Sequence, residues 1–225
     1  MKLRGRSAAR AEAGQSSAAG SGNLPACLAA LLLATAMPIC EGASLAVKVQ
    51  DATGRPVPDA AVYAEPASGQ QPAPMLRQVE IEQKHRTFIP LVTVIQAGTD
   101  IAFPNRDTVR HHVYSFSPAK TFEIKLYSGS GKTEHFDKTG TVVIGCNIHD
   151  QMIAYIQVVP TPYFAKTDAS GDAVLAGLLP GRYTLKAWHY RLPPGTPTPQ
   201  QGIEIGAGDA AASFKLELSP SAGSN

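Results

Sequence analysis

The chain has 225 residues, with 20 Lys and Arg against 18 Asp and Glu, which gives a formal net charge of +2. Hydrophobic residues make up 44% and charged residues 17%, a composition that excludes a disordered chain. The near-neutral charge argues against nucleic-acid binding, because that function needs a concentrated basic surface. Three Cys are too few for a disulfide-dense scaffold, and 20 Gly with 18 Pro are typical of short strands joined by turns.

Residues 1–43 predict an export signal. Basic residues come first, an apolar run covers residues 24–39, and small residues follow it. This order is typical of a secretory signal peptide, and Pro25 and Pro38 interrupt the run too much for a convincing membrane span. An N-terminal membrane anchor is the alternative. We therefore expect a periplasmic or secreted protein with no stable membrane insertion after the signal peptide is removed.

The position of the cysteines follows from this prediction. Cys27 and Cys40 lie within the predicted signal peptide, so Cys146 would be the lone thiol of the mature chain. A lone cysteine in an oxidising compartment has no partner for an internal disulfide. It is buried and inert, paired with another chain, or a ligand.

After the leader, apolar and β-branched runs alternate with turn residues at intervals near ten residues. This pattern predicts an all-β protein built from antiparallel sandwiches. In chain order, the predicted strands are residues 45–49, 60–64, 79–83, 91–95, 100–103, 112–116, 121–126, 141–145, 153–159, 173–176, 183–188, 201–205 and 213–218.

Two distant segments resemble one small domain. Residues 44–66 have the pattern of a strand, a Gly turn and a second strand, while residues 166–188 contain a Thr-Asp-Ala-Ser-Gly turn and a Leu-Pro-Gly-Arg-Tyr-Thr-Leu strand. Together they resemble the carboxypeptidase-regulatory-like (transthyretin-like) β-sandwich. The resemblance implies a discontinuous sandwich of residues 44–69 and 163–220, with a second domain, residues 70–162, inserted in it. Alternatively, both hairpins extend the central sandwich.

Candidate metal ligands gather in the central segment. Cys146, His149 and Met152 form a Cys-x-x-His-x-x-Met loop directly after a predicted strand, and His111 and His112 lie upstream. A thiolate and two imidazoles with a weak thioether suit copper that cycles between Cu(I) and Cu(II). Zinc is disfavoured, because thioether is a poor zinc ligand and the loop has no Cys-x-x-Cys.

This segment resembles the cupredoxins, the small blue copper proteins, and among them the plastocyanin- and amicyanin-like proteins. The loop has the family's spacing, and Asn105, His111 and Val113 follow its Asn…His-x-Val pattern. About 90 residues are also similar to bacterial plastocyanin-like proteins known as methylamine utilization proteins. The resemblance implies that residues 70–162 form a Greek-key cupredoxin sandwich.

The resemblance also implies a single type 1 copper ion with four ligands: His111, Cys146, His149 and Met152. It gives Asn105 the role of tying the histidine strand to the cysteine loop. Backbone amides near Asn147 could donate hydrogen bonds to the sulfur and raise the reduction potential.

The adjacent histidines leave the upstream ligand open. His112 occupies a position at which amicyanin-like proteins have Asn, so His111 or His112 could bind the metal. Neighbouring strand residues point to opposite faces, so only one should face it, and the spacing to Val113 favours His111. The other histidines are expected to be solvated or packing residues: His85, His135 and His189.

No enzyme motif is found in the sequence. Residues 129–133 imitate the end of a phosphate loop, but the required first Gly is Leu126, so we expect a hairpin turn there. A site with four protein ligands also leaves no open position for a substrate, unlike a catalytic metal centre. The chain is therefore not expected to be an enzyme.

The resemblance implies a one-electron carrier between redox partners. The partner would be a periplasmic redox protein, such as a c-type cytochrome or a dehydrogenase. One alternative is a copper-binding or delivery protein without redox turnover, which would use the same ligands. Another is a structural or binding β-sandwich module, which the regulatory-like segments favour.

Overall fold

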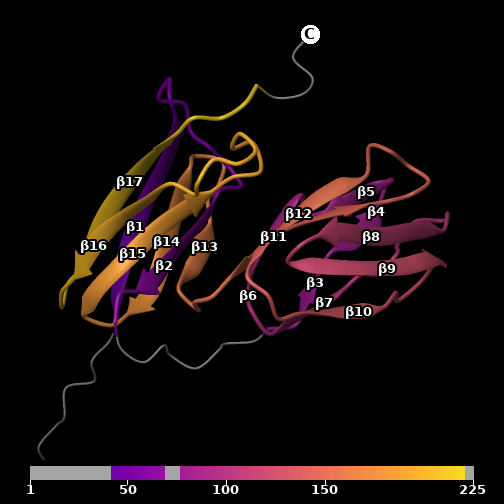
Figure 1. The fold of residues 1–225 in the computed structure, drawn as a ribbon, viewed down its shortest axis with the longest axis horizontal. Helices are drawn as coiled ribbons and strands as arrows, with labels where there is room; N and C mark the ends of the chain where they lie inside the picture. The colour runs from indigo at the N-terminus through magenta and orange to yellow at the C-terminus, as the bar shows by residue number, and fades with distance from the viewer. Residues whose placement is uncertain (1–41, 69–76, 221–225) are drawn as a thin grey trace, which may run out of the picture. The chain divides into compact units, whose positions relative to one another are not determined.

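A computed structural model describes residues 42–68 and 77–220 of the chain. These residues form strands, turns and loops, and no helix occurs among them (Figure 1). The predicted fold class, an all-β protein of sandwiches, is confirmed. No helix in these ranges is long and apolar enough to cross a membrane. The predicted signal peptide, with Cys27 and Cys40, lies outside the described residues except for Gly42 and Ala43.

One hydrophobic core lies between two sheets built from both ends of the described chain. The first sheet has the strand order β14-β1-β17, with β1 (Ala43–Asp51), β14 (Asp172–Leu178) and β17 (Ala210–Leu216). The second has the order β13-β2-β15-β16, with β2 (Ala61–Pro66), β13 (Phe164–Lys166), β15 (Gly181–Trp188) and β16 (Gln200–Ile205).

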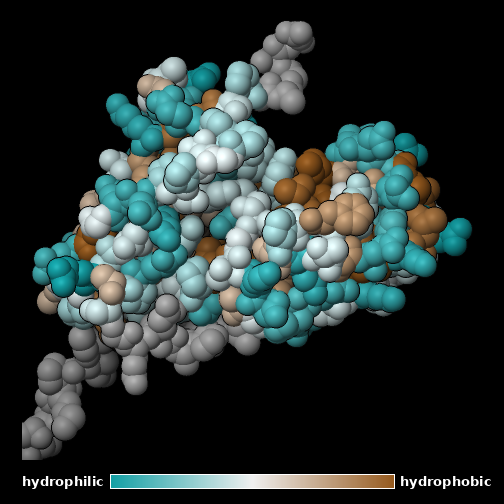
Figure 2. All heavy atoms as spheres, in the orientation of Figure 1, coloured by the Kyte–Doolittle hydropathy of each residue, from teal (hydrophilic) through white to brown (hydrophobic). Residues whose placement is uncertain are grey.

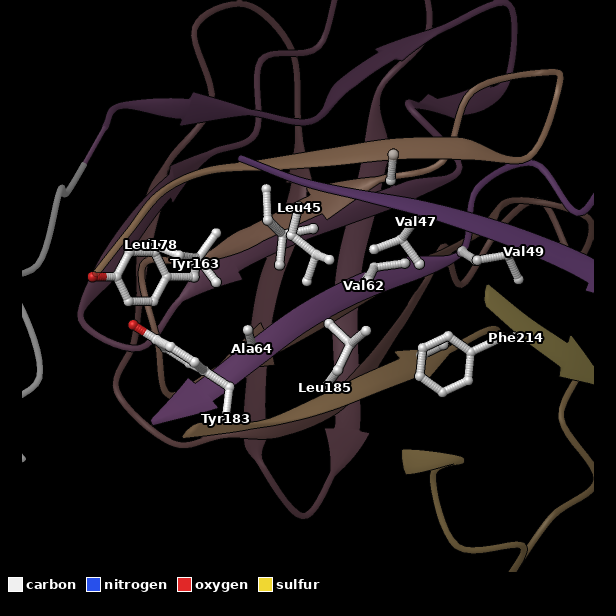
Figure 3. Close-up of a cluster of buried hydrophobic side chains, with 14 of the residues drawn as sticks. Leu45, Val47, Val49, Val62, Ala64, Tyr163, Leu178, Tyr183, Leu185 and Phe214 are labelled. Atoms are coloured by element: carbon white, nitrogen blue, oxygen red, sulfur yellow. The ribbon is translucent and has the colours of Figure 1, made fainter. Parts of the chain in front are cut away.

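The alternation of β1 explains how this core forms. Leu45, Val47 and Val49 are buried at every second position, as expected for a strand with one face on a core. Figure 3 shows these side chains beside Leu185 and Phe214, which come from the C-terminal part of the chain. Residues before and after the predicted insertion thus share one core. Whether this sandwich is a separate domain stays a prediction.

A second core is enclosed by strands of the central segment. Its larger sheet has the order β6-β12-β11-β8-β9, with β6 (Val92–Gln96), β8 (His111–Ser117), β9 (Lys120–Tyr127), β11 (Gly140–Gly145) and β12 (Ile153–Val159). The smaller sheet has the order β10-β7-β3, with β3 (Val79–Glu80), β7 (Thr99–Ala102) and β10 (Thr133–Phe136). A two-stranded ribbon consists of β4 (Glu82–Lys84) and β5 (Thr87–Ile89).

This core places the candidate ligands. Strands β8 and β11 are antiparallel neighbours, with Gly145 paired to Tyr114. The start of β8, at His111, and the end of β11, directly before Cys146, therefore lie at the same end of the sheet. Cys146 and Met152 are themselves buried members of the core cluster.

Each predicted strand overlaps a strand of the structure, although residues 79–83 are divided between β3 and β4. The short strands β5, β10 and β13 were not predicted. The prediction of a hairpin turn at residues 129–133 is wrong. This segment joins β9, which pairs with β8, to β10, which pairs with β7 in the other sheet. It is a crossover between sheets, and turn residues alone do not distinguish the two kinds of connection.

Candidate metal centre

Three donor side chains converge at one end of the β6-β12-β11-β8-β9 sheet. The potential ligand atoms of His111, Cys146 and His149 all lie within 4.8 Å of one another. The sulfur of Cys146 is 3.9 Å from Nδ1 of His111 and 3.9 Å from Nδ1 of His149. The structure thus brings together three of the four side chains that the sequence analysis named as candidate ligands, although they are separated by up to 38 residues.

The compact loop is held by its own backbone. The N–H of Cys146 donates to the carbonyl of Met152 at 3.3 Å, and the N–H of Met152 donates to the carbonyl of His149 at 2.9 Å. These bonds fold the loop back on the end of β11. As a result, His149 lies beside Cys146 while Met152 returns to the start of β12.

The spacing of the donors fits a transition-metal ion. With metal–sulfur and metal–nitrogen bonds of about 2.3 Å and about 2.0 Å, an angle of about 120° at the ion separates sulfur from nitrogen by about 3.7 Å. The two measured separations of 3.9 Å lie close to this value. One soft sulfur and two imidazole nitrogens are also the donor set that suits copper. The residues present therefore fit a copper ion.

The donors differ in their exposure. His111, Cys146 and Met152 are buried, whereas His149 is partly exposed. His149 is thus the donor that a second molecule can approach most closely. The Met152 side chain belongs to the same buried cluster as Cys146. Its role as the fourth ligand stays a prediction.

Asp107 is a residue beside the site that the sequence analysis did not find. Its Oδ2 lies 2.7 Å from Nε2 of His111, the ring nitrogen that does not face Cys146. Asp107 also accepts hydrogen bonds from the backbone N–H groups of His85, at 2.7 Å, and Arg86, at 2.9 Å. The spacing of four residues to His111 was visible in the sequence. In a loop, however, such a spacing has no fixed geometry.

The pKa of the Asp107 carboxyl lies below its ordinary value. Burial acts to raise this pKa, but the hydrogen bonds from the Arg86 backbone, the His111 ring and the His85 backbone outweigh it. The group is therefore an anion at neutral pH, in direct contact with a candidate ligand.

His112 does not join the donor group. Its Nε2 lies 3.1 Å from Oε1 of Glu123, and its ring packs against Tyr114 with centroids 5.7 Å apart. The structure thus brings His111, and not its neighbour, to Cys146. The other histidines lie apart from the group: His85 and His135 are exposed, and His189 is buried beside Tyr190.

Asn105 makes a different set of hydrogen bonds from the one expected. Its side-chain N–H₂ donates to the carbonyls of Val109, at 2.9 Å, and Tyr127, at 2.8 Å, and its Oδ1 accepts from the N–H of Asp107 at 2.9 Å. These bonds order the loop before His111 and attach it to the end of β9. None of them reaches the loop of Cys146, because the Asn105 side chain is directed into its own loop.

Asn147 is exposed, and its proposed backbone contact to the sulfur stays a prediction. A hollow of about 530 Å³ lies beside the centre. Its lining includes Cys146 and the apolar side chains of Phe116, Val143 and Ile153. Phe116 is 80% exposed. Figure 2 shows apolar groups, in brown, at the surface among polar residues.

No family model matches the chain, and no curated protein matches it. Among solved structures, it is similar to a Cu-containing nitrite reductase (NirK) from Thermus scotoductus SA-01, with 24% identity over 42% of this chain and a TM-score of 0.36. This chain spans only 25% of the length of that enzyme.

Two smaller proteins give similar matches. The purple cupredoxin from Nitrosopumilus maritimus is 19% identical over 36% of this chain and 99% of its own, with a TM-score of 0.31. Amicyanin from Paracoccus versutus is 14% identical over 43% of this chain and 98% of its own, with a TM-score of 0.34. In each of these three matches, less than half of this chain is aligned.

Proposed function

We propose that this chain is a cupredoxin-type copper protein that carries single electrons between redox partners. The observation that supports this most strongly is the convergence of the Cys146 sulfur with Nδ1 of His111 and Nδ1 of His149. When bound at such a set, copper supplies one-electron chemistry between Cu(I) and Cu(II).

An electron carrier also needs ligands that move little when the charge of the ion changes, and a site shielded from water. Cys146 offers a thiolate at the end of a paired strand, and His111 is held by Asp107 from the opposite side of its ring. Because strands and hydrogen bonds fix both side chains, little rearrangement should accompany a change of charge. The buried surroundings of Cys146 and Met152 keep bulk water away from the sulfur donors.

His149 would be the point of electron entry or exit, because it is the partly exposed donor. Ile148, its neighbour, is 48% exposed and would contribute to a contact surface. Redox encounters of this kind are small and transient. We propose a periplasmic redox protein, such as a c-type cytochrome or a dehydrogenase, as the partner, with export through the signal peptide. A relationship to the methylamine utilization proteins stays an expectation.

The proposal describes a carrier and not an enzyme. A centre with Cys146, two histidines and Met152 as ligands would have no open coordination position for a substrate. A copper-delivery protein would use the same ligands without redox turnover. The two functions differ in the rates that they require: fast electron self-exchange for a carrier and fast copper transfer for a delivery protein.

The test is the metal content and the optical spectrum of the purified full chain. We expect one copper ion per chain and an intense thiolate-to-Cu(II) absorption band in the visible range. Cys146→Ser should abolish the band, because an alkoxide cannot supply that transition, while the far-UV circular dichroism stays unchanged. Absence of the band after titration of the wild-type protein with Cu(II) would overturn the proposal. Copper transfer that outpaces electron self-exchange would favour delivery instead.

A further inference from the structure

We propose that Asp107 orients the His111 ring toward the metal and, through its negative charge, lowers the reduction potential of the centre. This inference rests on the proposed function, since it concerns the same site. Asp107 lies in a loop and would not itself bind the metal, but it would help to set the reduction potential.

Asp107 determines which tautomer the His111 ring adopts. An anionic carboxylate accepts hydrogen bonds and donates none, so the Nε2 of His111, 2.7 Å from Oδ2 of Asp107, must carry the proton. In a neutral imidazole the other nitrogen then has a free lone pair. That nitrogen, Nδ1, is the one directed at the Cys146 sulfur. Asp107 therefore leaves the metal-facing nitrogen of His111 ready to bind.

The Asp107 carboxylate is itself anchored. Asp107 accepts from the backbone N–H groups of His85 and Arg86, in the turn between β4 and β5, and contacts the ring of His111 at the start of β8. Both His85 and Arg86 have φ of 55°, a left-handed conformation that is uncommon outside glycine. This conformation of the β4–β5 turn directs two consecutive backbone N–H groups at the carboxylate. The turn thus fixes Asp107, and Asp107 fixes the ring.

The negative charge of Asp107 acts on the centre through His111. The Asp107 side chain is only 14% exposed, so solvent and salt screen it less than they screen a surface carboxylate. The nearest cation in sequence, Arg106, is engaged by Glu80 at 3.2 Å and by Glu82 at 2.7 Å. The Arg106 guanidinium is thus paired with these two glutamates and not with Asp107. A carboxylate partner makes a histidine ligand more basic, and a nearby negative charge favours Cu(II) over Cu(I).

The test compares the reduction potentials of copper-loaded wild type and Asp107→Asn. Asparagine keeps the shape of the side chain but removes the charge and replaces one acceptor oxygen by an NH₂ group, which donates hydrogen bonds. We expect the ratio of Cu(II) to Cu(I) affinity to fall about tenfold or more, which is about 59 mV toward higher potential for a one-electron couple. The visible band should remain.

Asp100→Asn is the matched control. Asp100 Oδ1 lies 2.7 Å from Nδ1 of His135, the same pair of groups at the same distance, but both side chains are more than half exposed and lie outside the donor group. This variant should keep the wild-type potential. A shift in Asp107→Asn that does not exceed the shift in Asp100→Asn would overturn the inference.

A second measurement does not require the variant to fold or copper to bind. Nitrogen-15 NMR of the metal-free wild-type protein, at a pH where the His111 ring carries a single proton, should show that proton on Nε2 and not on Nδ1. The reverse tautomer would overturn the orienting role of Asp107. A wild-type protein that never shows the visible band overturns the proposed function and the inference with it. A normal band with an unchanged potential in Asp107→Asn overturns the inference alone.

Discussion

The Nε2 of His112 lies 3.1 Å from Oε1 of Glu123, whereas the neighbouring His111 has Nδ1 3.9 Å from the Cys146 sulfur. Two consecutive histidines of β8 thus have separate partners. The division coincides with a shift in the register of β8 against β9 between His111 and Val113. The sequence left open which of the two histidines binds the metal, and substituting each in turn tests the assignment.

His111→Ala should abolish the visible absorption band, because it removes one of the converging nitrogen donors. His112→Ala should leave the band largely intact, since its ring contacts Glu123 and Tyr114 instead. Titration of each variant with Cu(II), followed by optical spectroscopy, checks both expectations. Loss of the band in His112→Ala together with its retention in His111→Ala would reverse the ligand assignment.

The parts of the site that could be predicted are those fixed by short spacings or by a family pattern. Cys146, His149 and Met152 lie within one seven-residue loop, so their proximity follows from the chain itself. His111 is 35 residues away from Cys146 and was chosen through the resemblance to cupredoxins. Its meeting with Cys146 depends on the pairing of β8 with β11, which spacing alone does not determine.

Asp107 could not be predicted in the same way. Its contact with His111 depends on a loop that Asn105 orders and on the left-handed turn at residues 85–86. The same limit applies to residues 129–133, where Gly and Ser indicate a turn but do not say which strands it connects. Strand alternation, in contrast, is a local property, and each predicted strand was found.

Met152→Leu tests the thioether. Leucine has a similar volume, so the buried position should accept it at a cost below about 1.5 kcal/mol of unfolding free energy. We expect the visible band to remain and the reduction potential to shift, because the weak axial donor that tunes this potential is lost. Protein-film voltammetry measures the potential. A variant with the wild-type potential would argue against Met152 as a ligand.

His189, which directly follows β15, should make the sandwich of β1, β2 and β13–β17 sensitive to acid. Burial, together with the charge of Arg191, lowers the pKa of the His189 ring from 6.5 to about 4. Between these values the unfolded chain takes up a proton that the folded state excludes. The stability that His189 contributes is therefore fully present above pH 6.5 and is lost as the pH falls through 4, by on the order of 3 kcal/mol.

His189→Gln removes this titration. Urea unfolding, monitored by the fluorescence of Trp188, should show that the loss of stability from about pH 7 to about pH 4.5 is smaller in the variant by about 2 kcal/mol. The difference between wild type and variant at about pH 8 gives the packing cost, because the ring is neutral in both states there. An equal loss of stability in the two proteins would show that His189 does not cause the acid sensitivity.

Gly131 should be intolerant of any side chain. Its φ is +72°, and a Cβ at this position would overlap the carbonyl oxygen of Phe103. Gly129, in the same loop, has φ of +84° but open space around the corresponding position. Gly129→Ala therefore carries only the cost of a left-handed backbone, about 1–2 kcal/mol of unfolding free energy. Gly131→Ala adds the overlap with backbone, for a total of about 3 kcal/mol or more. Urea unfolding monitored by far-UV circular dichroism compares the two, and equal destabilisation would show that the loop moves away from Phe103 at little cost.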